Sequence, residues 1–114
     1  MDFTKLTDKE ILEIATSHMD NIVEATSEKN YEKLSKDFTD RLKSMVTKDK
    51  FEMQMKEHDL GDFSKREFLS IIHKKDAIFV LWKQWFTKSS EEFLAEIIII
   101  HQDGRFLVDH DWFR

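Results

Sequence analysis

The stretch EIIIIHQDGRFLVDHDWF, residues 96–113, decides the fold because two apolar runs meet at Asp103-Gly104. A two-residue type I′ turn needs positive φ at both positions, which Asp tolerates and Gly adopts freely. The stretch therefore predicts an antiparallel β-hairpin whose register is set by its turn. The predicted pairs are Ile99 with Val108, Ile97 with His110, Ala95 with Trp112 and Glu96 with Asp111.

Strand-like composition begins well before this hairpin. Segments 66–74, 77–88, 91–102 and 105–113 are rich in Ile, Phe, Val and Trp, and only a few residues separate them. Links this short join antiparallel neighbours, so the sequence predicts a four-stranded antiparallel meander. A turn at Ser89-Ser90 sets the pairs of the preceding hairpin, which are Trp82 with Ile97, Val80 with Ile99, Lys83 with Glu96 and Trp85 with Leu94.

The first half of the chain has helical periodicity instead. Residues 8–26 repeat apolar side chains at spacings of three and four, with Thr7 as the N-cap and Glu10 completing a capping box. This pattern predicts a long amphipathic helix. The fold class is thus α+β, with about three helices packed on the concave face of a bent four-stranded sheet.

Two shorter helices follow in the prediction. Asn30 is a suitable cap for one of them, and Thr47 is a suitable cap for another that ends at Gly61. Residues 39–46 suit either a helical turn or an extended link, and both alternatives stay open.

Length and composition restrict the classes of function. The 114 residues fit a single domain, 1–114, and 40% hydrophobic residues are enough for one core. A net charge of -5 disfavours nucleic acid as a partner. The chain has no cysteine, no leader-like N-terminus and no long apolar run, so we expect a cytoplasmic protein without a membrane partner.

Strand alternation sorts the sheet residues onto an inner face, which the helices cover, and an outer face. The inner face is predicted to be nearly all apolar, with Gln84, His73, His101 and His110 as polar exceptions. The outer face is predicted to carry Phe79, Leu81, Trp85, Ile98, Ile100, Leu107 and Phe113. Such a patch exceeds what a monomer normally exposes, so we expect a homodimer joined through the outer face. The alternative is partial burial under the N-terminal arm or the 58–65 loop.

The order of elements resembles the nuclear-transport-factor-2-like superfamily, which has a cystatin-like α+β fold. The segments that carry the resemblance are NYEKLSKDF at 30–38, TKDKFEMQMKEHDLG at 47–61 and the final hairpin. The resemblance implies dimerisation through the outer sheet face. For enzymes of this architecture, it also implies a cavity between the helices and the sheet that contains an inward carboxylate.

The predicted inner face lacks Asp and Glu on its last three strands, and only Glu67, at the rim of the first strand, has the inward parity. Its polar residues instead indicate a pocket for a small apolar ligand, lined by His18, Trp82, Gln84, His110 and Trp112. The acidic residues Glu96, Asp109 and Asp111 are interpreted as a salt-bridged edge and not as a metal site.

Two functional hypotheses follow. The first is a non-enzymatic module for small-ligand binding or oligomerisation, with no catalytic residue, metal or cofactor. The second is a cofactor-free lyase or isomerase that acts on a small apolar substrate, with His110 or His18 as the base. An inward carboxylate beside such a histidine would favour the enzyme.

Overall fold

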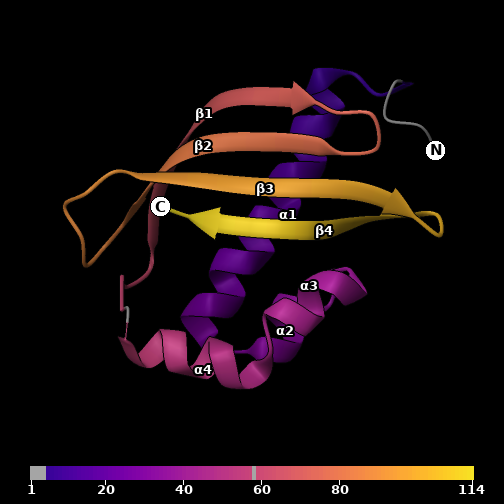
Figure 1. The fold of residues 1–114 in the computed structure, drawn as a ribbon. Coiled ribbons are helices and arrows are strands. Elements are labelled where there is room, and N and C mark those ends of the chain that lie inside the picture. The colour runs from indigo at the N-terminus through magenta and orange to yellow at the C-terminus, as the bar shows by residue number, and fades with distance from the viewer. Residues whose placement is uncertain (1–4, 58) are drawn as a thin grey trace.

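The computed structural model describes residues 5–57 and 59–114, and it has the predicted α+β architecture. Four helices precede four strands that form one antiparallel sheet in the order β1-β2-β3-β4 (Figure 1). The helices are α1 (Asp8–Glu28), α2 (Tyr31–Ser35), α3 (Asp40–Met45) and α4 (Lys48–Glu57). The strands are β1 (Phe63–His73), β2 (Ile78–Phe86), β3 (Phe93–Gln102) and β4 (Arg105–Phe113). Helix α3 settles residues 39–46 as helical, so there are four helices where about three were expected.

Helix α1 forms where the sequence predicted it. The hydroxyl of Thr7 accepts a hydrogen bond from the Glu10 amide, and the Glu10 carboxylate accepts one from the Thr7 amide. This capping box satisfies amide groups that lack partners within the helix. The apolar stripe of α1 is buried in the core through Ile11, Ala15, Met19, Ile22 and Ala25.

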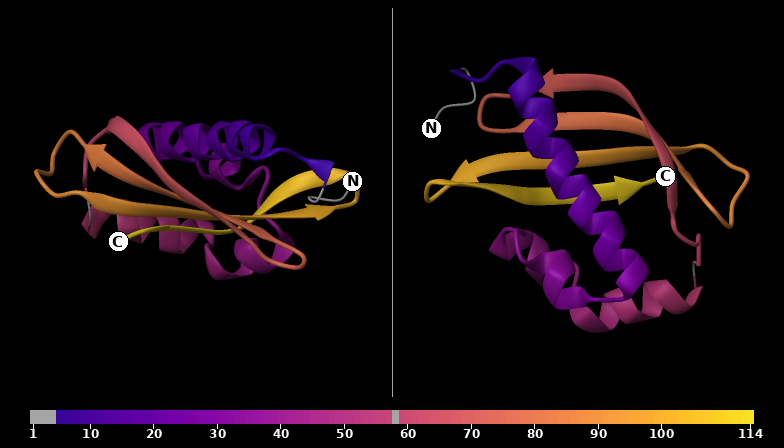
Figure 2. Two further views of the ribbon diagram at one scale, coloured as in Figure 1. Left: turned by 90° about the horizontal axis from the view of Figure 1, so that it is seen from above. Right: turned by 180° about the vertical axis from the view of Figure 1, so that it is seen from behind.

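The sheet has one covered face and one open face. Helix α1 runs diagonally across the inner face, and α2, α3 and α4 lie beyond the β4 edge (Figures 1 and 2). Along β2, buried and half-buried residues alternate strictly, with Val80 and Trp82 toward the core. This alternation is typical of a strand that packs on one side only.

The hairpin between β2 and β3 pairs differently from the prediction. Val80 lies opposite Ile97, and Trp82 lies opposite Ala95, so the register differs by two residues from that of a Ser89-Ser90 turn. The connection spans residues 87–92, which makes it a longer loop. Because a shift of two preserves alternation, each residue stays on its predicted face.

The last hairpin keeps its predicted register only at its turn end. Asp103 and Gly104 both have positive φ, 53° and 75°, and Ile99 pairs with Val108 as expected. The register then shifts, because Ile98 pairs with His110 and leaves Asp109 as an extra residue. Such a β-bulge moves every later residue to the opposite face.

The bulge corrects the predicted face of four residues and the predicted partner of a fifth. Asp111 and Phe113 lie on the inner face, where they pair with Ile97 and Ala95. His110 and Trp112 lie on the outer face of the sheet, so neither is part of the concave inner face. Glu96 pairs with Trp112 rather than with Asp111.

Strand β1 contains a similar irregularity at Leu69, between Phe68 and Ser70. Before this point, Arg66 pairs with Gln84 on the inner face and Glu67 pairs with Lys83 on the outer face. The prediction that Glu67 points inward is therefore wrong. The inward polar residue of this strand is a cation, Arg66.

Candidate functional site

The bulge in β4 is fixed by residues that are distant in sequence. Asp109 Oδ1 accepts hydrogen bonds from Thr39 Oγ1 at 2.8 Å and from Arg41 Nε at 3.1 Å. Thr39 is also the N-cap of α3, so the start of this helix and the extra residue of β4 are joined at one point. Burial raises the pKa of Asp109, but hydrogen bonds from Arg41 and Thr39 outweigh this effect and lower it overall.

Backbone hydrogen bonds reinforce this junction. The Thr39 amide donates to the Val108 carbonyl at 2.9 Å, and the Val108 amide donates to the Asp37 carbonyl at 2.8 Å. Phe38 thereby forms a parallel bridge with Val108 along the outer edge of β4. The segment between α2 and α3 thus holds β4 at the position of its bulge.

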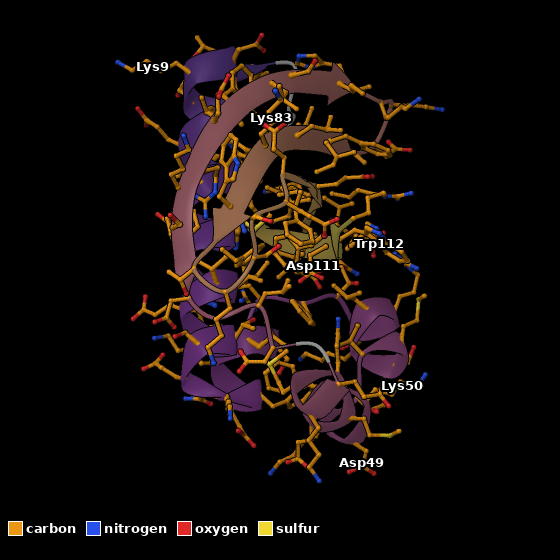
Figure 3. All side chains as sticks on the ribbon, turned by 90° about the vertical axis from the view of Figure 1, so that its left-hand side faces the viewer. Lys9, Asp49, Lys50, Lys83, Asp111 and Trp112 are labelled. Atoms are coloured by element: carbon orange, nitrogen blue, oxygen red, sulfur yellow. The ribbon has the colours of Figure 1, made fainter. Side chains whose placement is uncertain are left out.

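As a consequence of the bulge, Asp111 points into a cavity of about 660 Å³ between the sheet and the helices. In Figure 3, Asp111 lies between the strands and α4, while Trp112 lies on the side of the sheet away from α1. The apolar walls come from both layers of the fold. They include Ile22 of α1, Leu34 of α2, Phe51 and Met55 of α4, and Phe86, Phe93 and Phe113 of the sheet.

Asp111 has no counter-charge among the described residues. No hydrogen bond or ion pair joins its carboxyl group to any other residue in the described ranges 5–57 and 59–114. Burial raises the pKa of Asp111 to about 6 because the ionised form loses hydration without gaining a partner. A carboxyl group of this kind takes up or releases a proton close to physiological pH.

Aromatic rings surround this end of the cavity. Phe86 makes edge-to-face contacts with Phe93, at 5.4 Å between ring centroids, and with Phe113, at 5.5 Å. Edge-to-face packing is a favoured arrangement of aromatic rings. It holds three phenylalanines as one cluster, and Phe113 belongs to that cluster only because the bulge brings it inward.

The rim of the cavity is polar. Lys88 Nζ binds Asp59 Oδ2 at 2.7 Å, and the Asp62 carboxylate accepts a hydrogen bond from the Ser27 hydroxyl. The Asp62 amide donates to Thr87 Oγ1 at 2.9 Å, which joins the chain before β1 to the end of β2. These contacts position the loop that borders the cavity.

The predicted pocket residues do not form one site. Trp82 and Gln84 are on the inner face as expected, but both are buried in the core and neither lines the cavity. Trp112 borders the cavity, yet it is 47% exposed and stacks on His110 on the outer side. None of the four described histidines, His18, His73, His101 and His110, lines the cavity.

His18 lies elsewhere, beside the β3–β4 hairpin. Its Nδ1 is 3.7 Å from Asp37 Oδ2, and Asp37 Oδ1 binds Arg105 at 2.7 Å. Burial lowers the pKa of His18, although the Asp37 carboxylate and the Phe106 carbonyl oppose this effect. His18 therefore lies in the middle of α1, beside Asp37, and does not line the cavity that Asp111 faces.

Gln84 belongs to a buried polar network. Its Oε1 accepts from Arg66 Nε at 2.9 Å, and Arg66 Nη1 binds Asp20 of α1 at 2.7 Å. Gln84 Nε2 and Arg66 Nη2 lack hydrogen-bond partners among the described residues. The network ties the β1 edge of the sheet to α1.

None of the residues predicted to form the dimer interface is fully buried. Phe79, Leu81, Trp85, Ile98, Ile100 and Leu107 are all on the outer face and half-buried, whereas Phe113 is on the inner face. Residues Leu60 and Asp62 pair with the end of β2, and the chain from Phe63 onward is part of β1. The described part of the 58–65 loop therefore does not cover the outer face, and residues 1–4 of the N-terminal arm lie outside the described ranges.

Asp111 was missed because strict alternation was assumed along the whole of β4. The segment FLVDHDWF, residues 106–113, carries no signal that would reveal the bulge. Apolar residues stand at both even and odd positions before and after the polar triplet 109–111, so the sequence shows no change of phase.

Comparison with known proteins identifies no family. No protein-family model matches the chain, and no curated protein matches it either. Within the described residues, no group of three or more His, Asp or Glu side chains is placed to share a metal ion. None of the helices formed by these residues is both long and apolar enough to cross a lipid bilayer.

Proposed function

We propose that this protein is a small-ligand-binding module of the nuclear-transport-factor-2-like type, and that its ligand occupies the cavity around Asp111. The observation that carries the proposal is the Asp111 carboxyl group, which has no partner among the described residues and faces a cavity with apolar, aromatic walls and a polar rim. Ligand sites combine apolar walls with a few polar groups that fix orientation, and cavities of roughly 300–1,000 Å³ are typical for them. The expected ligand is small and largely apolar.

The proposal can be tested with the neutral dye N-phenyl-1-naphthylamine, which becomes fluorescent in apolar surroundings. We expect the native chain to enhance its emission in a saturable way. Val46→Phe narrows the cavity because Val46 lies in its wall, so this variant should bind the dye less. Leu107→Phe makes a comparable change on the outer face and serves as the control. Equal dye binding by the two variants would contradict the assignment of the cavity.

Proton abstraction is the second candidate function, and the base is Asp111 rather than His18 or His110. A carboxylate whose pKa is raised by burial is suited to act as a general base. This candidate predicts that the native chain catalyses deuterium exchange at the α-carbons of a small apolar ketone in D₂O. Asp111→Asn should abolish that exchange. A rate equal to that of buffer would leave binding as the sole function.

The homodimer belongs to the same proposal. The apolar outer face supports it, because helices cover only the inner face and a second copy is the partner that would bury a self-complementary patch. Phe113 is no longer part of the proposed interface. His110 and Trp112 replace it at the β4 edge of that surface.

A further inference from the structure

The described charges that face the cavity leave Asp111 as an uncompensated anion when it is ionised. Besides Asp111, four charged side chains of the described ranges lie on the walls, and these are Lys29 after α1, Asp59 and Asp62 before β1, and Lys88 after β2. Lys88 is paired with Asp59, and the Asp62 carboxylate is bound by Ser27. The two rim acids offset the two lysines, so a ligand that enters the cavity meets one unpaired carboxylate at its aromatic wall.

The aromatic rings next to Asp111 would also favour positive charge. The face of a phenylalanine ring carries partial negative charge and attracts a cation placed over it. Phe86, Phe93 and Phe113 form the contact cluster on this wall, and Phe113 is two residues from Asp111 on the same face of β4. A carboxylate and an aromatic cluster thus line the same cavity.

We propose that the ligand of this cavity is a small primary or secondary amine with an apolar body, whose ammonium group pairs with Asp111. The inference rests on the proposed binding function and assigns the chemical class of the ligand. The ammonium group supplies the counter-charge that the described residues do not provide, and the apolar body fills the space between the phenylalanine cluster and α4. The burial of Asp111 that raises its pKa is thereby compensated in the complex.

Three probes of nearly equal size separate charge from shape. They are 2-phenylethylamine, the neutral 2-phenylethanol and the anionic 3-phenylpropanoate, each titrated into the full chain at pH 8 by NMR or calorimetry. We expect the amine to bind at least about tenfold more tightly than the alcohol, equivalent to about 1.4 kcal/mol. The carboxylate should bind most weakly of the three.

Asp111→Asn preserves the shape of the site and removes its charge, so we expect it to bring the amine and the alcohol to similar affinity. Glu91→Gln removes one negative charge from the exposed β2–β3 loop and should leave the preference intact. In the native chain, amine binding should also move the titration of the Asp111 carboxyl carbon to lower pH.

The outcomes distinguish this inference from the binding function. If the neutral dye binds in the cavity but the amine and the alcohol bind equally, the amine assignment is overturned and the binding function stands. If neither the dye nor any of the three probes perturbs the cavity residues, both are overturned. If Asp111→Asn still binds the amine more tightly than the alcohol, the preference comes from the net charge of the protein. That result would overturn the pairing of the amine with Asp111.

Discussion

Thr39 Oγ1 donates a hydrogen bond to Asp109 Oδ1 over 2.8 Å, between residues that are 70 positions apart in the chain. This contact and the neighbouring contact of Arg41 with Asp109 lie at the extra residue of β4. Two residues later, Asp111 faces the cavity. The contacts at the N-terminus of α3 thus hold the bulge that turns Asp111 toward the cavity, although α3 does not itself bond to Asp111.

We expect Asp109→Ala to destabilise the protein by about 2 kcal/mol, because it removes hydrogen bonds to a cation and to a helix cap. Urea denaturation measures this change. Asp40→Ala, within the first turn of α3, removes an exposed acid and should cost less than about 1 kcal/mol. Equal losses in the two variants would show that Asp109 contributes no more than an ordinary surface acid.

The contacts of Asp109 with Thr39 and Arg41 also predict that stability depends on pH. The pKa of Asp109 is lowered in the folded state, so its contribution is present above the ordinary pKa of 3.8 and is lost as pH falls below it. The difference in unfolding free energy between the native chain and Asp109→Asn should therefore shrink between about pH 4 and pH 2. A difference that stays constant over this range would contradict an ionic role.

Asp111 affects the pH dependence of stability in the opposite direction. Its pKa is raised from 3.8 to about 6, so the folded state binds the proton more tightly than the unfolded state. As pH rises from 3.8 to about 6, ionisation of Asp111 lowers the stability of the folded state. This loss of stability is complete above the folded-state pKa. Asp111→Asn should therefore be more stable than the native chain by about 1–3 kcal/mol at pH 8 and similar to it near pH 4. Chemical denaturation at the two pH values tests this prediction, and a variant less stable at pH 8 would refute it.

Local chemistry made much of this fold predictable. The capping box of Thr7 and Glu10 and the turn at Asp103-Gly104 depend on residues within a few positions of one another. Strand alternation placed β2 correctly even though its pairing with β3 was shifted, because a shift of two keeps each residue on its face.

The bulge in β4 could not be derived in this way. It depends on Thr39 and Arg41, which reach Asp109 only after the chain has folded. Strict alternation therefore assigned Asp111 and Phe113 to the outer face and His110 and Trp112 to the inner face. Because of this error of register in β4, the predicted pocket contained His110 in place of the Asp111 carboxylate.

The two glycines offer a matched comparison at positive φ. A Cβ at Gly61 would clash with Thr87 Oγ1, whereas a Cβ at Gly104 would have no atom within 4 Å. Gly104→Ala should cost about 1 kcal/mol from backbone strain alone. Gly61→Ala should cost about 2–4 kcal/mol, because the Thr87 contact at the cavity rim must also move. Thermal unfolding ranks the two variants, and a larger loss at Gly104 would contradict the packing at the rim.

Assembly provides the last prediction. Sedimentation equilibrium of the native chain should give about twice 13.7 kDa, because the half-buried apolar outer face needs a partner. Ile98→Lys places a charge at the centre of that face, between Phe79 on β2 and His110 on β4, and should shift the chain toward monomer. Met53→Lys is the control, since Met53 is 60% exposed on α4 and lies outside the outer face. A native chain that stays monomeric at high concentration would refute the homodimer while leaving the cavity assignment intact, because each cavity is built from one chain.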